Sequence, residues 1–270
     1  MKKIVKLSLV AFLATGTFAY ADATKRYAQG YTYYKVVWQS VDYTSHTSTD
    51  DGRAYDTSSS VDNPVYVIGG LYNLTNTWDI STEVSTTLVP TRSTEDGTAK
   101  DGTTSTSFKN NLEVLNNTIT GYAHYKFSNE HRVIGGLTYN LSSWKRYNFT
   151  LPSVQGQVIL QRSMAINMEA GYWYEGYFMP EDKLHVNFKA IAGIPIWEKT
   201  ENTSEDVTFS NRSGYNFDIA VNTGYLVYND AEIGATLGYN YTKKDSAHSS
   251  GVYVPEDTFE TFYFGVYAAF

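Results

Sequence analysis

Residues 231–242 read AEIGATLGYNYT and alternate strictly between two kinds of side chain. The apolar and aromatic set is Ala231, Ile233, Ala235, Leu237, Tyr239 and Tyr241; the polar or glycine set is Glu232, Gly234, Thr236, Gly238, Asn240 and Thr242. Successive side chains of a β-strand point to opposite faces. This stretch therefore predicts a strand with one apolar face and one polar, glycine-rich face.

The same period of two recurs along most of the chain, for example at 184–196 and 216–228. Pro195 interrupts one of these segments, and because it cannot donate to a ladder we expect it near a strand end or at a bulge. Alternation and turn signals together predict about ten strands. Their expected spans are 30–44, 63–74, 77–91, 110–127, 131–148, 165–179, 182–198, 213–228, 231–243 and 257–270.

The connections between these segments alternate in length. Short turns are expected at 73–76, 128–130, 179–181 and 229–230, and long polar loops at 45–62, 92–109, 149–164, 199–212 and 244–256. Short turns at one end and long loops at the other are typical of transmembrane β-barrels, with turns in the periplasm and loops outside the cell. Segment 149–164 leaves three alternatives open: an extended loop strand, an inward plug, or a count of twelve strands.

The composition supports the same all-β class, a transmembrane antiparallel up-and-down barrel. Aromatic residues make up 16% of the chain, yet its mean hydropathy is -0.36. That pairing is expected where alternate residues face lipid and lumen and aromatic girdles mark the two membrane interfaces. Such a barrel needs no disulfides, and the chain contains no cysteine.

The first residues have the pattern of an export signal. Lys2, Lys3 and Lys6 precede a short apolar run at 7–14, and residues 19–21 give a small-x-small cleavage pattern. We expect a signal peptide at 1–21 and a barrel domain at 22–270. The formal charge of -7 then becomes -10, because three lysines and no acids are removed. The electrostatic field of this negative net charge disfavours a nucleic-acid partner.

The end of the chain alternates again and closes on an aromatic residue. Phe262, Phe264, Val266, Ala268 and Phe270 form the apolar set. This ending resembles the insertion signal of Gram-negative outer-membrane β-barrel proteins, although Ala268 departs from the bulky residue often found there. The resemblance implies a location in the bacterial outer membrane, recognition of Phe262, Phe264, Val266 and Phe270 by the barrel-assembly machinery, and contact with outer-membrane lipid and lipopolysaccharide. It identifies no subfamily.

The polar faces of the predicted strands carry charges of both signs. The residues assigned to the lumen are Lys35, Glu83, Lys126, Glu169, Glu175, Lys189, Asp218 and Glu232. They could line a narrow channel and set its ion preference, or they could pair with one another and fill the interior. Barrels of about eight strands are filled and wide channels have ~16–18 strands, so ten strands leave both alternatives open.

Two hydrolase patterns known in outer-membrane barrels were compared with the chain. Omptin proteases, also ten-stranded, use paired acids and an Asp-x-His, and no Asp-x-His occurs here. Lipid A deacylases use a His-x-Ser pair with a glutamate, a spacing matched in outline by His248 and Ser250 with Glu256 or Glu260. Serine and histidine are also ordinary constituents of surface loops. We therefore assign no catalytic residue.

Acids gather in loop 45–62 as Asp50, Asp51, Asp56 and Asp62. Clustered carboxylates can bind Ca²⁺ or Mg²⁺, but the spacing matches no EF-hand and suits a solvated loop. We expect no metal and no cofactor.

The preferred function is a monomeric, porin-like passive channel for ions or small polar solutes. The alternative is a surface adhesin or receptor with a filled lumen, binding a ligand through loops 45–62, 92–109 and 244–256. A lipid A deacylase-like hydrolase comes third. A continuous lumen favours transport, whereas a lumen crossed by Lys–Glu pairs favours a scaffold for the loops.

Overall fold

The computed structural model describes residues 30–49, 52–178, 183–202, 207–210, 212–228, 231–249 and 252–270. The expected signal peptide and the turns expected at 179–181 and 229–230 lie outside these residues. Across the described ranges, no helix is long and apolar enough to cross a membrane.

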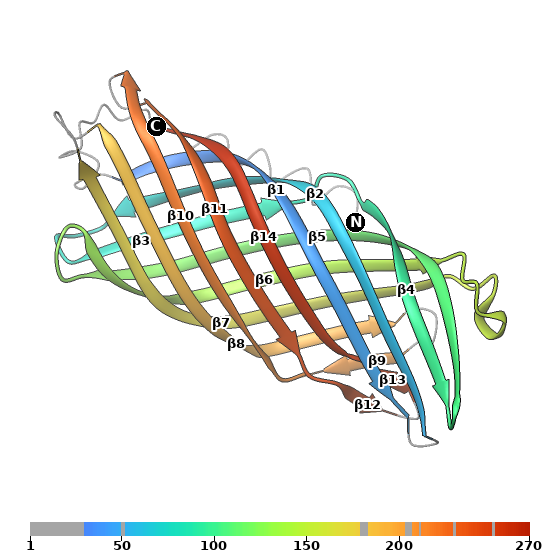
Figure 1. Ribbon diagram of the computed structural model, residues 1–270. Coiled ribbons are helices and arrows are strands. Elements are labelled where there is room, and N and C mark those ends of the chain that lie inside the picture. Colours follow the sequence, from blue (N-terminus) through green and yellow to red (C-terminus); the bar gives the residue numbers. More distant parts are fainter. Residues whose placement is uncertain are drawn as a thin grey trace, which may run out of the picture.

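The chain forms a closed, ten-stranded antiparallel barrel (Figure 1). Strand β1 pairs with β2 on one side and with β14 on the other, which closes the sheet. The all-β barrel predicted from the alternation is confirmed. The strands are β1 (Gly30–Ser48), β2 (Arg53–Asn73), β3 (Trp78–Thr86), β4 (Thr91–Asp101), β5 (Thr104–Lys126), β6 (His131–Tyr147), β7 (Ile159–Phe178), β8 (Leu184–Asn202), β9 (Val207–Ser210), β10 (Gly214–Tyr228), β11 (Ala231–Lys244), β12 (Ala247–Ser249), β13 (Val252–Val254) and β14 (Glu256–Ala269).

Strands β3 and β4 together act as one strand of the barrel. Both lie between β2 and β5, with β3 paired to residues 66–73 of β2 and β4 paired to residues 53–58. The interruption at 87–90 ends in Pro90, which has no backbone N–H to donate to a ladder. Strand β9 pairs with residues 199–202 of β8, on the edge where β10 pairs with residues 184–193, so it adds no strand to the ring. The count of ten holds and twelve is wrong.

Strand alternation separates a lipid-facing surface from the interior. On β11, Leu237 is 50% exposed and its neighbour Thr236 only 4%. Across the sheet, Leu237 lies opposite Phe264, which in turn lies opposite Trp38. These outward apolar side chains form a belt around the barrel, as expected for a surface that contacts lipid.

The strands are much longer than a membrane crossing requires. Strand β5 has 23 residues and β2 has 21, whereas a crossing takes about 9–11 residues. The loops expected at 45–62 and 92–109 are therefore wrong in large part: they are paired strands of the hairpins β1–β2 and β4–β5. These strands are polar because solvent contacts their outer face, and they are nevertheless hydrogen-bonded into the sheet.

The remaining expected loops are shorter than predicted. Segment 149–164 holds a short 3-10 turn, η1 (Pro152–Val154), before β7 begins at Ile159. Strand β8 continues to Asn202, and the loop 244–256 contains the small β12–β13 hairpin. The short turns near 73–76 and 128–130 are confirmed. In Figure 1 the long hairpins extend from the end of the barrel opposite the short turns.

A bulge lies next to Pro195, which is one of the two places expected for this residue, a strand end or a bulge. In the β7–β8 ladder, Pro195 pairs with Asn167 and Trp197 pairs with Ile166, so Ile196 is the extra residue. The bulge changes which residue numbers face inward: Ile191 is buried before it, and Glu198 is buried after it. Odd-numbered residues of β8 therefore face the interior before the bulge, and even-numbered residues face it afterwards.

Candidate functional site

The interior contains charged side chains at two depths, with a chamber between them. We call the set near the short-turn end the periplasmic layer, because short turns are periplasmic in outer-membrane barrels. It comprises Asp79, Lys126, Arg132, Glu175, His185 and Glu232. The set toward the long hairpins, the outer layer, comprises Tyr43, Glu95, Arg146, Glu198, Arg212, Lys244 and Asp257.

Arg132 is at the centre of the periplasmic layer. Its Nε lies 3.0 Å from Asp79 Oδ2 and its Nη1 lies 2.7 Å from Glu175 Oε2. Lys126 Nζ lies 2.9 Å from the other oxygen of Asp79. All four side chains are buried. The pairs connect β3, β5, β6 and β7 across the interior, so this part of the lumen is occupied by ion-paired groups.

His185 continues the periplasmic layer on β8. Its Nδ1 lies 2.9 Å from Glu232, and its Nε2 lies 3.4 Å from Glu175. The imidazole stacks on Tyr177 with ring centroids 4.6 Å apart, and the Tyr267 hydroxyl donates to Glu232. The layer therefore extends from Asp79 on β3 through β5, β6, β7 and β8 to Glu232 on β11, and Tyr267 adds a contact from β14.

The outer layer is also a connected network. Arg146 Nε lies 2.8 Å from Glu95, and its Nη2 donates to the Tyr43 hydroxyl at 2.9 Å. Tyr43 donates to Asp257 at 3.0 Å, and Asp257 accepts from Arg212 at 3.2 Å. An apolar cluster that includes Val41, Leu112 and Trp144 packs with Tyr43. The outer layer thus combines ion pairs with packed apolar side chains.

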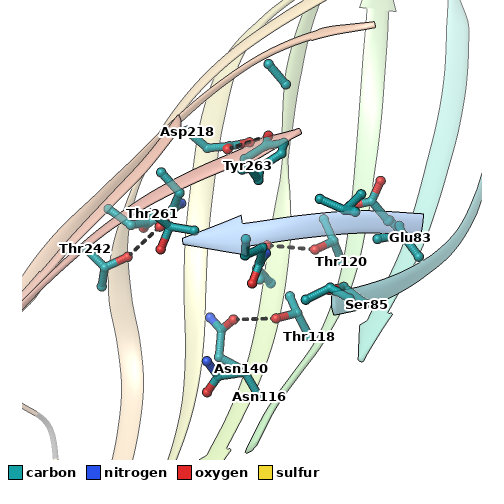
Figure 2. Close-up of a pocket in the computed structure, with 18 of the residues that line it drawn as sticks. Glu83, Ser85, Asn116, Thr118, Thr120, Asn140, Asp218, Thr242, Thr261 and Tyr263 are labelled. Carbon is teal, nitrogen blue, oxygen red and sulfur yellow. Dashed lines mark hydrogen bonds between the residues drawn. The ribbon is translucent and has the colours of Figure 1, made fainter. Parts of the chain in front are cut away.

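The chamber between the layers has a volume of about 340 Å³. Lys35 lies 3.7 Å from Glu83, and Lys189 lies 2.7 Å from Asp218. Figure 2 shows Asp218 beside Tyr263, whose hydroxyl donates to it at 3.1 Å. The same view shows a wall of amide and hydroxyl side chains that includes Asn116, Thr118, Thr120, Asn140, Thr242 and Thr261.

The eight residues assigned to the lumen from sequence fall into two of these regions. Lys126, Glu175 and Glu232 belong to the periplasmic layer. The other five line the chamber: Lys35, Glu83, Glu169, Lys189 and Asp218. Glu169 accepts from Tyr122, from Thr138 at 2.6 Å and from Asn216 at 2.6 Å.

Sequence reasoning missed about half of the charged interior, for three reasons. Asp79 and Arg132 lie inside expected strands with inward parity, so alternation alone could have identified them. Glu95 lies in a stretch interpreted as loop. Glu198 lies after the bulge next to Pro195, where even-numbered instead of odd-numbered residues of β8 face the interior. No local signal in the sequence tells whether a residue beyond such a bulge faces the lumen or the lipid.

Strand β14 presents its terminal apolar residues to the outside. Phe262, Phe264, Val266 and Phe270 are all exposed on the barrel surface. The backbone of Phe270 also exchanges two hydrogen bonds with Thr32, at 2.8 and 2.9 Å, beside the β1–β14 seam. Recognition of these residues by assembly machinery stays a prediction.

The residues of the hydrolase pattern have other partners. The His248 ring stacks on Tyr253 with centroids 4.2 Å apart. Glu256 pairs with Lys243 at 3.1 Å, and Glu260 accepts from Tyr239 at 3.3 Å. Within the described ranges no hydrogen bond joins His248 to either glutamate, and Ser250 lies outside those ranges.

A second hollow, of about 770 Å³, lies where the hairpins β1–β2 and β4–β5 meet β14. Its lining includes Asp56 and Asp96, and it is rich in serine and threonine. Hydrogen bonds from His46 and Lys100 hold the pKa of Asp56 below its usual value. Asp50 and Asp51 lie outside the described residues, and among the described ones no group of three or more His, Asp or Glu side chains could hold a metal ion.

Comparison with known proteins gives fold similarity without a family. No family model and no curated protein matches the chain. Among solved structures, the outer membrane protease OmpT from Escherichia coli has a TM-score of 0.59 and 12% sequence identity, covering 95% of this chain and 98% of that one. The outer membrane protein OprG from Pseudomonas aeruginosa gives 0.37 and 10%, covering 90% and 96%. Ail of Yersinia pestis gives 0.29 and 10%, covering 90% and 99%.

The OmpT likeness covers almost the whole of both chains, and at this identity it establishes the fold alone. The closed antiparallel barrel with an exterior apolar belt is the fold of outer-membrane β-barrels, which the OmpT likeness supports.

Proposed function

We propose that this chain is a closed, non-conducting outer-membrane barrel that presents its extracellular strands as a binding surface, as a surface receptor or adhesin. This is the alternative that the sequence left open beside a porin-like channel. The observation that carries it is the periplasmic layer, in which Arg132 is 1%, Glu175 1% and Glu232 0% exposed. An aqueous pore would leave charged lining groups accessible to water.

The energetics of the ion layers support a lasting closure. Opening a path would separate buried pairs, and removing one partner from such a pair typically costs about 3–5 kcal/mol. The outer layer adds a second barrier through Arg146 and Glu95 on the far side of the chamber. A solute would have to break both networks to cross the barrel.

The long hairpins support the binding half of the proposal. Several strands continue well past the apolar belt, and the β1–β2 and β4–β5 hairpins form the hollow that contains Asp56 and Asp96. Rigid paired strands lose less conformational entropy on binding than flexible loops do. An extracellular sheet of this kind is suited to holding a partner.

A proteolytic or lipolytic activity has less support. OmpT is a protease, but this chain lacks the Asp-x-His of the omptin pattern. His248, the base of the deacylase-like pattern, stacks on Tyr253 and has no hydrogen bond to Glu256 or Glu260 among the described residues. A general base must lie within hydrogen-bond reach of the group that it activates.

Planar-bilayer recording of the refolded full chain tests the closure. We expect no steady conductance steps from protein whose insertion is verified by a heat-dependent shift in gel mobility, with a general porin recorded in parallel. Regular single-channel conductance steps in the wild type would contradict the proposal of a closed barrel and would support a porin-like channel instead.

Surface display tests the binding half. A trimmed variant would join Thr44 to Ser58, and Gly97 to Phe108, through Asn-Gly turns, because each of these pairs is in register. Cells displaying the full chain should attach to immobilised glycans or extracellular-matrix proteins more strongly than cells displaying equal amounts of the trimmed barrel. Equal attachment to every member of the panel would contradict the proposal.

A further inference from the structure

The chamber between the two ion layers has features of a small-molecule site. Its volume of about 340 Å³ falls within the ~300–1,000 Å³ typical of such sites. Its lining reaches the extracellular part of β10 and β11, where Tyr215 lies opposite Lys243 and is 48% exposed. The lining also includes His185 of the periplasmic layer and Glu198 and Lys244 of the outer layer, so the chamber extends from one layer to the other.

The lysines and acids that line the chamber all have protein partners. Its lining contains four lysines and four acids: Lys35, Lys189, Lys243, Lys244, Glu83, Glu169, Asp218 and Glu198. Each lysine has an acid within 4 Å, at 3.7 Å for Lys35, 2.7 Å for Lys189, 3.1 Å for Lys243 and 3.2 Å for Lys244. Glu169 is satisfied by three neutral donors, Tyr122, Thr138 and Asn216. A charged ligand would therefore have to displace a protein partner, whereas an uncharged ligand would not.

The neutral wall offers hydrogen-bond donors to an occupant. Asn140 accepts from Thr118 at 3.1 Å through Oδ1, and Asn240 accepts from Thr242 at 3.1 Å in the same way. Among the described residues, their Nδ2 groups donate to no protein atom. Figure 2 shows the Asn140 carboxamide with its oxygen bonded to Thr118 and its nitrogen turned away from that bond.

Two residues of the chamber lining each have a buried polar atom without a partner within the described part of the chain. These atoms are the indole Nε1 of Trp173 and the Oδ1 of Asn216, and both residues are 7% exposed. One is a donor and the other an acceptor. Buried polar groups are nearly always hydrogen-bonded, so the two atoms indicate an occupant that both accepts and donates.

We propose that the chamber binds an uncharged, hydroxyl-rich small molecule of the polyol or monosaccharide class. A hydroxyl provides one donor and two acceptor lone pairs, which matches the free amide and indole N–H groups and the free Asn216 oxygen. Ordered water has the same hydrogen-bonding capacity, and a chamber that holds water alone is the competing outcome. The site goes beyond the proposed surface function and does not depend on it.

Equilibrium dialysis of the refolded full chain against radiolabelled glucose, galactose and myo-inositol tests the site. Gluconate and glucosamine are the charged probes of similar size. We expect saturable binding of at least one neutral probe and binding of the charged probes that is weaker by about tenfold or more, equivalent to ~1.4 kcal/mol. Equal affinity for charged and neutral probes would overturn the ligand class.

Variants connect binding to the chamber. Asn140→Leu removes the amide donor at similar volume, and Trp173→Phe removes the indole N–H but keeps an aromatic ring. Each should weaken binding of the neutral probe by about tenfold, the scale of one lost hydrogen bond. Asn111→Leu on β5, which lies outside the chamber lining, is the matched control and should bind like wild type.

A folded wild-type chain that takes up none of the neutral probes would show that the chamber holds water only. Binding that survives both chamber variants would place the ligand elsewhere. Heat-dependent gel mobility of every variant establishes that it folds, so a loss of binding is not confused with a loss of the barrel. Conductance is not used as a readout, so a failure here is distinguishable from a failure of the proposed closure.

Discussion

Arg132 on β6 and Glu175 on β7 form an ion pair with 2.7 Å between Nη1 and Oε2, inside a barrel where both residues are 1% exposed. The same arginine pairs with Asp79, so it joins β3 to β7 through the interior. Removing one partner of a desolvated pair leaves an uncompensated buried charge, and the network is costly to disrupt for that reason.

Arg132→Met should therefore lower the free energy of unfolding by about 3–5 kcal/mol. The matched control is Asp96→Asn, which breaks the exposed Lys109–Asp96 pair of 2.8 Å and should cost ~0.2–1 kcal/mol. Urea titration of refolded protein, followed by tryptophan fluorescence, measures both. Similar losses in the two variants would mean that the periplasmic layer is well hydrated.

The apolar belt can be tested on a single strand. Val36→Arg on β1 would place a charge on the lipid-facing surface between Val266 and Tyr66, and near mid-membrane this costs ~2–4 kcal/mol. Asp42→Arg changes an outward residue on the same strand beyond the belt, and we expect a shift within about 0.5 kcal/mol. Refolding titrations in lipid vesicles compare the two variants, and equal destabilisation would refute the placement of the belt.

The bulge at Ile196 predicts an unusual tolerance to deletion. Removing Ile196 brings Trp197 directly after Pro195, so the ladder with β7 becomes regular and Glu198 stays inside. Removing Ala190 from the regular part of β8 instead turns residues such as the buried Ile191 toward lipid. The folded fraction on a heat-modifiability gel should stay near wild type for the Ile196 deletion and fall sharply for the Ala190 deletion. A reversed order would place the extra residue elsewhere.

The C-terminal residue can be separated into backbone and side-chain contributions. Deleting Phe270 removes its ring and both backbone hydrogen bonds to Thr32, whereas Phe270→Ala removes only the ring. If the ring is part of an insertion signal, both variants should reach the periplasm but assemble less folded barrel in the outer membrane. Assembly of the alanine variant at wild-type level would assign the effect of the deletion to the seam.

Period-two alternation, readable at 231–242, determined the fold class, the number of strands and the outward or inward direction of most side chains. The reason is physical: a strand in a closed barrel contacts lipid on one side and the interior on the other, so each position is constrained locally. Alternation also placed Lys35, Glu83 and Asp218 on inward faces. Pro195 indicated a strand end or a bulge, and the structure has the bulge.

Only the tertiary structure decided which inward charges meet. Lys35 pairs with Glu83 across 48 positions of sequence, and Arg146 reaches Glu95 across 51. Such pairs depend on strand stagger and barrel closure, which no local pattern encodes. The long hairpins were misread as loops because a solvated strand outside the membrane has polar residues on its outer face and gives no apolar alternation. Sequence thus determined the two faces of each strand, and the three-dimensional register decided that the inner faces meet as two ion layers around a polar chamber.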